Sequence, residues 1–304
     1  MDEISVLAPA TVANVVCGFD CLGFALSEPC DEMTIRKIDE PVVRIINRDD
    51  YGLPTDPEKN VAGVALLAFL AAAKVDFGFE VEITKNIMPG SGIGSSAASA
   101  CGAVVAANAL LDNRFTKLEL VDLAMAGEAL ASGSRHADNL APCIYGGFTL
   151  VRSTEPLDIV EIDFPPLFAT VIHPQIEIKT SEARAMLPKE VPLKSAIRNW
   201  SNLGSLVAAL AKGDYALIAR SLEDTIVEPV RKSLIPKFDE VKAASLAAGA
   251  LGGGISGSGP SIFMLSETRE IADAVAVSMK TVFESTEISF RIHRSQIASN
   301  GVAF

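Results

Sequence analysis

Hydrophobic residues recur along the chain with two different periods, which predict both helices and strands. Val61, Ala65 and Phe69 follow helical spacing within a long apolar run. Residues 79–84 instead alternate apolar and acidic side chains, which predicts a half-buried strand. Alanine- and leucine-rich segments of the first kind are interspersed with valine- and isoleucine-rich segments of the second kind. The pattern therefore indicates a mixed α and β protein.

The same periods and the turn residues between them predict the elements of two halves. The first half is predicted to hold strands at 4–8, 33–38, 42–46 and 79–84, and helices at 60–74, 96–111 and 118–131. The first strand is expected to break at Pro9. Short strands are then predicted at 148–152, 160–162 and 169–172, followed by helices at 181–187, 194–212, 215–222, 237–248 and 269–283 and strands at 262–265 and 287–293. The proline-rich residues 163–166 lie between the halves, so we expect one domain over 1–164 and another over 165–304.

Charge and length limit the classes of partner. The chain has 304 residues, enough for one or two domains, and a net charge of −12. A surface that acidic repels nucleic acid, and no cluster of Lys or Arg offsets it. The start of the chain has no signal peptide pattern, and the most apolar run, 61–73, is too short to span a bilayer. The five cysteines form no Cys-x-x-Cys pair, which favours buried reduced thiols. We therefore expect a cytoplasmic protein without a membrane or nucleic acid partner.

The residues 89–96 form a loop rich in glycine and serine that is suited to binding phosphate. Gly90, Gly92 and Gly94 remove every second side chain, so the backbone can turn tightly and present its N–H groups. Ser95 and Ser96 then begin an alanine-rich helix, and a helix N-terminus carries unpaired amides and a partial positive charge. We predict that an anion binds at this loop.

Other interpretations of this loop fit less well. A Walker A loop needs a lysine near its end, and no lysine lies between Asn86 and Arg114. A dinucleotide fingerprint needs a third glycine where Ser95 stands, and Asp112 ends the following helix instead of a second strand. A plain tight turn with a serine cap needs only one or two glycines. Phosphate binding is therefore favoured over the other three.

The loop, with Ala97-Ala98-Ser99 behind it, resembles the central motif of the kinases that act on galactose, homoserine, mevalonate and phosphomevalonate. Two further segments agree with that superfamily: residues 8–14, which lead into Gly18-Phe19-Asp20, and residues 252–261, which end Ser-Gly-Ser-Gly-Pro-Ser. The three motifs stand in the right order across nearly the whole chain. The resemblance implies an ATP-dependent kinase of the α+β class. Its N-terminal domain would resemble the second domain of ribosomal protein S5, and its C-terminal domain would be ferredoxin-like.

Within that superfamily the chain most resembles the homoserine kinases, through residues 18–23, 136–139, 180–184, 228–231 and 234–236. This family phosphorylates the side-chain hydroxyl of L-homoserine with ATP and Mg²⁺, a step toward threonine. The resemblance also implies a homodimer. Two alternatives stay open: a related kinase for mevalonate-like or sugar substrates, and a binding protein that keeps the fold without the activity.

The resemblance implies a substrate site that suits an amino acid. Its members are Asn14, Asp20, His136, Asn139, Thr180, Arg184 and Arg231. Asp20 would bind the ammonium of the substrate, although an aspartate is also common in turns. Arg184 and Arg231 would hold the carboxylate, since a guanidinium pairs with it through two bonds. Solvent-exposed helix arginines are the alternative for both.

The ATP site implied by the resemblance consists of Asn60, Pro89, Gly90, Ser91, Gly92, Ile93, Gly94, Ser95, Ser96 and Ser99. Ser96 and Glu128 would bind Mg²⁺, which prefers oxygen ligands and would supply the positive charge that a Walker lysine supplies elsewhere. On local grounds alone, Asn60 is an ordinary helix cap.

Four of these residues, Ser96, Glu128, Asn139 and Arg231, are the expected catalytic residues. Related kinases have an aspartate, proposed as the catalytic base, where this sequence has Asn139. We therefore expect no protein base, since positioning and charge stabilisation can suffice for phosphoryl transfer. The neighbouring Asp138 is not assigned the role of base, because alternation along the chain could direct its side chain elsewhere.

Overall fold

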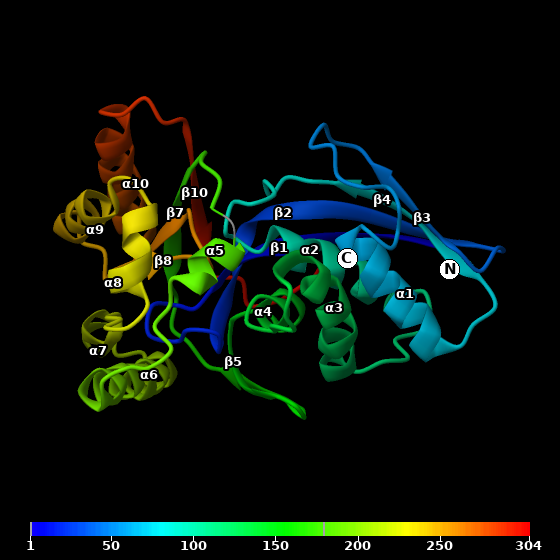
Figure 1. The fold of residues 1–304 in the computed structure, drawn as a ribbon, viewed down its shortest axis with the longest axis horizontal. Helices are drawn as coiled ribbons and strands as arrows, with labels where there is room; N and C mark the ends of the chain where they lie inside the picture. The colour runs from blue at the N-terminus through cyan, green and yellow to red at the C-terminus, as the bar shows by residue number, and fades with distance from the viewer. Residues whose placement is uncertain (1, 179) are drawn as a thin grey trace.

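The computed structural model describes residues 2–178 and 180–304, without the side chains of residues 180 and 181. Two β-sheets lie side by side, and helices cover them (Figure 1). The first half contains β1 (Glu3–Ala13), β2 (Leu22–Ile38), β3 (Val43–Asn47), α1 (Val61–Ala73), β4 (Gly78–Thr84), α2 (Ser95–Ala109), α3 (Lys117–Ser132), α4 (Leu140–Tyr145), β5 (Phe148–Thr154) and β6 (Leu157–Ile162). The predicted mixture of helices and strands is confirmed.

The second half begins with β7 (Phe168–Pro174) and ends with β10 (Phe290–Gln296). Between them lie α5 (Thr180–Ala185), α6 (Leu193–Lys212), α7 (Tyr215–Ser221), α8 (Glu228–Arg231), the 3₁₀ turn η1 (Lys232–Leu234), α9 (Phe238–Ala247), β8 (Gly252–Ile255), β9 (Ile262–Ser266) and α10 (Arg269–Glu284). Among the described residues no helix is long and apolar enough to cross a membrane.

The first sheet is organised around the long strand β2. Its strands follow the order β3-β4-β2-β5-β6, and β1 pairs with β2 as well. The β3–β4 pair is parallel and the other pairs are antiparallel. Helices α1 to α4 lie on one side of this sheet (Figure 1). Phe69 of α1 and Phe79 of β4 are fully buried between these two layers, together with Met33 and Ile35 of β2.

The first strand does not end at Pro9, contrary to the sequence prediction. β1 continues to Ala13, and its pairing with β2 shifts register between Pro9 and Thr11. A proline is tolerated in a strand at such an irregularity, because the ladder is locally interrupted there. The strand therefore reaches the glycine loop, and Thr11 N–H donates to the Ile93 carbonyl at 3.1 Å.

The second sheet has the order β10-β7-β9-β8 and is antiparallel throughout. Helices α9 and α10 pack on one face, where Phe238 and Phe283 meet Met264. On the opposite face, α6 and α7 pack with the first half in one shared core. In this core Phe24 contacts Phe148 of its own sheet and Phe263 of the second sheet, with ring centroids 4.9 Å and 5.6 Å apart. The two sheets thus bury a common layer of side chains.

Candidate active site

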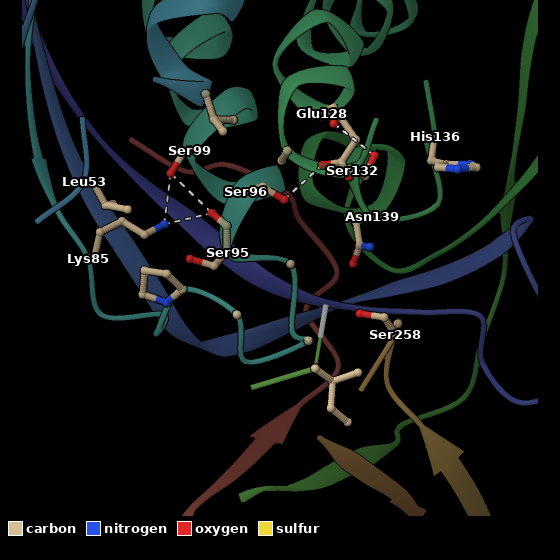
Figure 2. Close-up of a pocket in the computed structure, with 18 of the residues that line it drawn as sticks. Leu53, Lys85, Ser95, Ser96, Ser99, Glu128, Ser132, His136, Asn139 and Ser258 are labelled. Atoms are coloured by element: carbon tan, nitrogen blue, oxygen red, sulfur yellow. Dashed lines mark hydrogen bonds between the residues drawn. The ribbon is translucent and has the colours of Figure 1, made fainter. Parts of the chain in front are cut away.

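One cavity of about 360 Å³ brings together most of the residues predicted for the site. Its lining includes Asn14, Asp20, Asn60, Pro89, Gly90, Gly92, Gly94, Ser95, Ser96, Ser99, Glu128, His136, Asn139, Arg184 and Arg231. Ser91 and Ile93 of the predicted set also belong to the loop, but they are buried and are not part of this lining. The side chain of Thr180 lies outside the described part of the chain. Figure 2 shows the cavity with Leu53 and Lys85 at one end and His136 at the other.

The backbone of the loop needs its glycines. Gly90, Gly92 and Gly94 have φ angles of 76°, 81° and 71°, in the left-handed region that favours glycine. A Cβ at Gly92 would lie 2.6 Å from the Gly259 carbonyl oxygen, and one at Gly94 would lie 2.0 Å from Thr11 Oγ1. Gly94 is also the N-cap residue of α2. The loop can therefore present backbone N–H groups at the positive end of that helix.

The three serines at the start of α2 have different partners. Ser95 Oγ donates to the Ile87 carbonyl at 2.9 Å, and Ser99 Oγ donates to the Ser95 carbonyl at 3.3 Å. Both hydroxyls thus hold the loop and the first turn of the helix. Ser96 Oγ instead donates to Glu128 Oε2 at 3.0 Å, and both residues line the cavity (Figure 2).

A lysine that the sequence analysis missed lies against this helix. Lys85 is buried at the end of β4, where it forms an ion pair with the buried Asp31. Its Nζ also donates to the Ser95 carbonyl at 2.8 Å and to Ser99 Oγ at 2.9 Å. Lys85 precedes the glycine loop, whereas a Walker lysine stands near the end of its loop. Because its ammonium is fully bonded and its charge is balanced by Asp31, Lys85 fixes α2 to the sheet and adds little net positive potential beneath the loop.

The second half of the chain holds the loop from the other side. Ser256 Oγ donates to the Gly92 carbonyl at 2.7 Å, and Ser261 Oγ donates to the Ser91 carbonyl at 2.6 Å. Both serines are fully buried. The hydroxyls of the segment 252–261 therefore bind carbonyl groups of the loop and do not occupy its N–H groups.

Glu128 provides a buried carboxylate beside Ser96. It lies inside α3, 9% exposed, and burial raises the pKa of its carboxyl. A carboxylate in this position favours a nearby cation, because the cation offsets the cost of burying the charge. Among the described residues no cluster of three or more His, Cys, Asp or Glu side chains could hold a metal. A metal here would therefore depend on oxygens from a ligand or water as well.

The end of the cavity near α1 has an apolar wall that no sequence motif predicted. Leu53, Pro54, Val61 and Ile83 line it. Asn60 caps α1 through Oδ1, which accepts from Ala62 N–H at 3.0 Å, while its Nδ2 donates to the Pro54 carbonyl at 2.7 Å. The side chain of Asn60 is thus engaged at both ends in shaping this wall.

Charged groups gather at the opposite end. Arg184 Nη2 lies 2.9 Å from both carboxylate oxygens of Asp20 and 3.0 Å from His136 Nε2. Burial lowers the pKa of His136. A neutral imidazole can accept the Arg184 N–H at Nε2. Asp20, Arg184 and His136 thus converge from three separate segments of the chain.

Arg231 is the most deeply buried cation of this group, with 3% of its surface exposed. Its Nε donates to the Ala183 carbonyl at 3.1 Å, and its Nη1 lies 3.4 Å from the Gly257 carbonyl. The guanidinium lies over the Phe19 ring, 5.1 Å from its centroid. Burial lowers the pKa of Arg231, because these neutral partners replace water poorly. An anionic ligand would offset that cost.

Two amides complete the site. Asn14 Oδ1 accepts from Asp20 N–H at 2.9 Å and Asn14 Nδ2 donates to the Gly257 carbonyl at 2.7 Å, so this residue joins the two halves. Asn139, at the start of α4, accepts a hydrogen bond from Thr11 at 2.7 Å. Asp138, which precedes Asn139 in the chain, also lines the cavity. Burial, and after it the charges of Asp20 and Glu128, raises the pKa of Asp138 to about 7.

Comparison with known proteins agrees with this geometry. Residues 60–147 match the family described as GHMP kinases N terminal domain, and residues 206–285 match GHMP kinases C terminal. A mevalonate kinase from L. major, solved with R-mevalonate, has a TM-score of 0.75 at 18% identity, covers 97% of this chain and 95% of its own, and shares the fold. The fold is thus that of the GHMP kinases, and the predicted fold class is confirmed.

Relatives of much higher identity define the family. A homoserine kinase from Chloroherpeton thalassium is 49% identical over 93% of both chains, and one from Chlorobium phaeobacteroides is 46% identical over 96% of this chain and 95% of its own. The crystal structure of homoserine kinase from Cytophaga hutchinsonii has a TM-score of 0.95 at 50% identity and covers 100% of this chain and 97% of its own. The chain belongs to the homoserine kinase family.

Proposed function

We infer that this protein is an ATP-dependent kinase that phosphorylates the side-chain hydroxyl of L-homoserine to give O-phospho-L-homoserine, a step in threonine biosynthesis. The observation that carries this conclusion is a single cavity that joins the glycine loop to Asp20, Arg184 and Arg231. Such a cavity can hold a phosphoryl donor and an amino acid at the same time. Its acceptor end has charges that a sugar would not need.

The acceptor end suits a zwitterion. Asp20 and Arg184 pair with each other, so a ligand that separates them must offer both an ammonium and a carboxylate. Arg231 adds a second guanidinium whose two hydrogen bonds go to neutral carbonyls. We propose that Asp20 binds the ammonium, and that Arg184 and Arg231 bind the carboxylate. His136 and Asn14 would hold Arg184 and Asp20 in place, and Thr180 stays a proposed contact from the resemblance.

The donor end suits ATP. The residues 89–96 and the N-terminus of α2 would bind the phosphates, and the apolar wall at Leu53 and Ile83 would receive the base. Asn60 would then act through the shape of that wall.

The oxygens of Ser96 and Glu128 fit Mg²⁺, because a hydroxyl and a buried carboxylate lie together at the edge of the phosphate loop. When bound, the metal would neutralise charge on the β- and γ-phosphates.

The transfer itself would proceed without a protein base. The substrate oxygen forms a bond to the γ-phosphorus while the bond from that phosphorus to the β–γ bridging oxygen breaks. ADP leaves, and the hydroxyl proton passes to a phosphoryl oxygen. Asn139 would touch the reacting groups as a hydrogen-bonding residue, and Arg231 would hold the substrate in line with the phosphoryl group.

Of three further proposals, the dimer rests on the family resemblance, and the location and the domain boundary rest on the sequence itself. We propose that the protein is cytoplasmic, that it forms a homodimer, and that its domains divide at 164/165. The last proposal is supported by the sheet order, because β6 closes the first sheet and β7 begins the second. Sedimentation analysis of the purified protein tests the dimer.

The activity is tested by ADP release from ATP and Mg²⁺ with and without L-homoserine, with the product identified by phosphorus NMR. L-homoserine should stimulate release, and mevalonate and galactose should not. Asp20→Ala should raise the KM for L-homoserine by at least about tenfold, because a charged hydrogen bond is lost, with little change in the KM for ATP. Absence of stimulation by any hydroxylated amino acid would overturn the proposed function.

A further inference from the structure

We propose that Thr11 is a positioning residue that orients the amide of Asn139 toward the reacting groups. The inference rests on the proposed function and concerns a side chain outside the cavity lining. Thr11 is fully buried in β1, and its Oγ1 donates to Asn139 Oδ1 at 2.7 Å. Asn139 itself lines the cavity, between Ser96 and Ser258 in Figure 2.

The hydrogen bond fixes which end of the amide faces the cavity. Because Asn139 Oδ1 is directed to Thr11, its Nδ2 is directed away from β1. The reverse orientation would make the Thr11 hydroxyl an acceptor. Its proton would then lose the bond to Asn139, which is its hydrogen-bond partner among the described residues. Leaving a buried donor unpaired costs about 1–3 kcal/mol. The Thr11 hydroxyl therefore selects an amide that donates into the cavity.

Thr11 also contacts the phosphate loop. Its backbone N–H donates to the Ile93 carbonyl at 3.1 Å, and its Oγ1 occupies the space that a Cβ at Gly94 would enter. The shift of register in β1 just before Thr11 sets which way this side chain points. One residue thus links the loop that would bind the phosphoryl donor to the amide that would meet the acceptor.

A neutral donor at this place has a specific use. Charge on the transferred phosphoryl group spreads over its oxygens in the transition state, and an N–H aimed at one of them stabilises that charge. If the Asn139 amide could rotate freely, its oxygen would face the cavity part of the time. That oxygen would repel the phosphoryl group. Thr11 would prevent this turn and would do so without touching either substrate.

The test compares Thr11→Val, which removes the hydroxyl at similar size, with Thr11→Ser, which keeps it. Thr11→Val is expected to lower kcat about tenfold, the equivalent of about 1.4 kcal/mol, with both KM values within about twofold of wild type. Thr11→Ser should restore most of kcat. Thr149→Val is the matched control, because Thr149 is equally buried in β5 and its Oγ1 has no hydrogen-bond partner among the described residues. It should keep the wild-type kcat.

A double-mutant cycle tests whether Thr11 acts through Asn139. In an Asn139→Ala background, Thr11→Val should change the remaining kcat by no more than about twofold. An unchanged kcat in Thr11→Val, a kcat of Thr11→Ser as low as that of Thr11→Val, or an equal loss in Thr149→Val would overturn the positioning role. Wild-type protein without activity on L-homoserine would instead overturn the proposed function, so the two failures are distinguishable.

Discussion

Glu128 carries a carboxyl group that is buried beside the Ser96 hydroxyl. Glu128 lies in α3 with the Ser96 hydroxyl as a partner, and burial raises the pKa of its carboxyl. We expect Glu128→Gln to lower kcat by at least about hundredfold, because a buried carboxylate that would bind Mg²⁺ is lost. Its melting temperature should stay within a few degrees of wild type, since the amide keeps the shape and removes a buried charge. Steady-state kinetics and thermal unfolding measure the two effects.

Asp122→Asn is the control for that substitution, because Asp122 lies in the same helix with an exposed side chain. It should leave kcat unchanged. Retention of wild-type activity in Glu128→Gln would remove the proposed metal role of this residue.

Asp138 leads to a prediction about pH. Because the pKa of its carboxyl is raised to about 7, Asp138 is mostly protonated at pH 6 and ionised at pH 8. An ammonium ligand at this end of the cavity favours the ionised form. We therefore expect the KM for L-homoserine to rise about tenfold as the pH falls from 8 to 6 at saturating ATP. In Asp138→Asn this pH dependence should disappear. A dependence that persists in the variant would assign it to another group, such as the phosphates of ATP.

For single residues, the sequence predicted which side chains line the cavity better than it predicted the hydrogen-bond partners of those side chains. Serines and glycines in a fixed order indicate phosphate binding, because the backbone freedom of glycine and the hydroxyl of serine can be recognised from the residue types alone. Lys85 was missed because a lysine before the loop carries no local signal, and its bonds to Asp31 and Ser99 depend on the packing of β4 against α2. Thr11 lies within the motif at residues 8–14, yet its contact with Asn139 joins residues 128 positions apart. Such pairs are set by the fold.

The turn from the glycine loop into α2 is the element on which the donor site depends. Gly94→Ala should be strongly destabilising, because a Cβ there meets Thr11 Oγ1 at 2.0 Å in addition to the strain of a positive φ. Gly90→Ala adds only the strain of a positive φ, since no atom of the described part of the chain lies within 4 Å of a Cβ at Gly90. Isothermal titration with ATP should show a loss of affinity of at least about thirtyfold in Gly94→Ala and less than about tenfold in Gly90→Ala. Equal effects in the two variants would show that backbone strain, rather than the contact with β1, decides the loop conformation.

The hydrophobic period of the sequence predicted the helices and strands that bury one apolar face. Helix α3 was expected at 118–131 and spans Lys117–Ser132, with a Thr116–Glu119 capping box at its start. The glycine-rich β8 and the six-residue α4, which contains Pro142, were not predicted. Neither shows an apolar period, and both are held by neighbours: β8 pairs with β9, and α4 packs against α2. Tertiary contacts decide such short segments.

The two halves of the molecule are held together by tertiary contacts as well as by the chain that connects them. The last residues return to the first half, where Ala303 pairs with Leu7 and Val302 N–H donates to the Cys143 carbonyl at 2.8 Å. The shared core places Phe24 and Phe148 of the first half against Phe263 of the second. A division at 164/165 would therefore separate two sheets but cut through one hydrophobic core. Because the cavity also has walls from both halves, its geometry depends on that core.

Unfolding should therefore be a single transition for both halves. Phe24→Ala in the first sheet should lower the free energy of unfolding by about 3–5 kcal/mol. The loss should appear equally in circular dichroism, which follows both halves, and in the fluorescence of Trp200, the one tryptophan of the sequence, which lies in α6 of the second half. Val160→Ala, at an exposed position of β6, should change the free energy of unfolding by less than about 0.5 kcal/mol.

If the unfolding midpoint of Phe24→Ala measured by Trp200 fluorescence stayed at the wild-type value while the midpoint measured by circular dichroism moved, the halves would unfold independently. The active site would then be an interface between two domains, held by their contact and not by a common core.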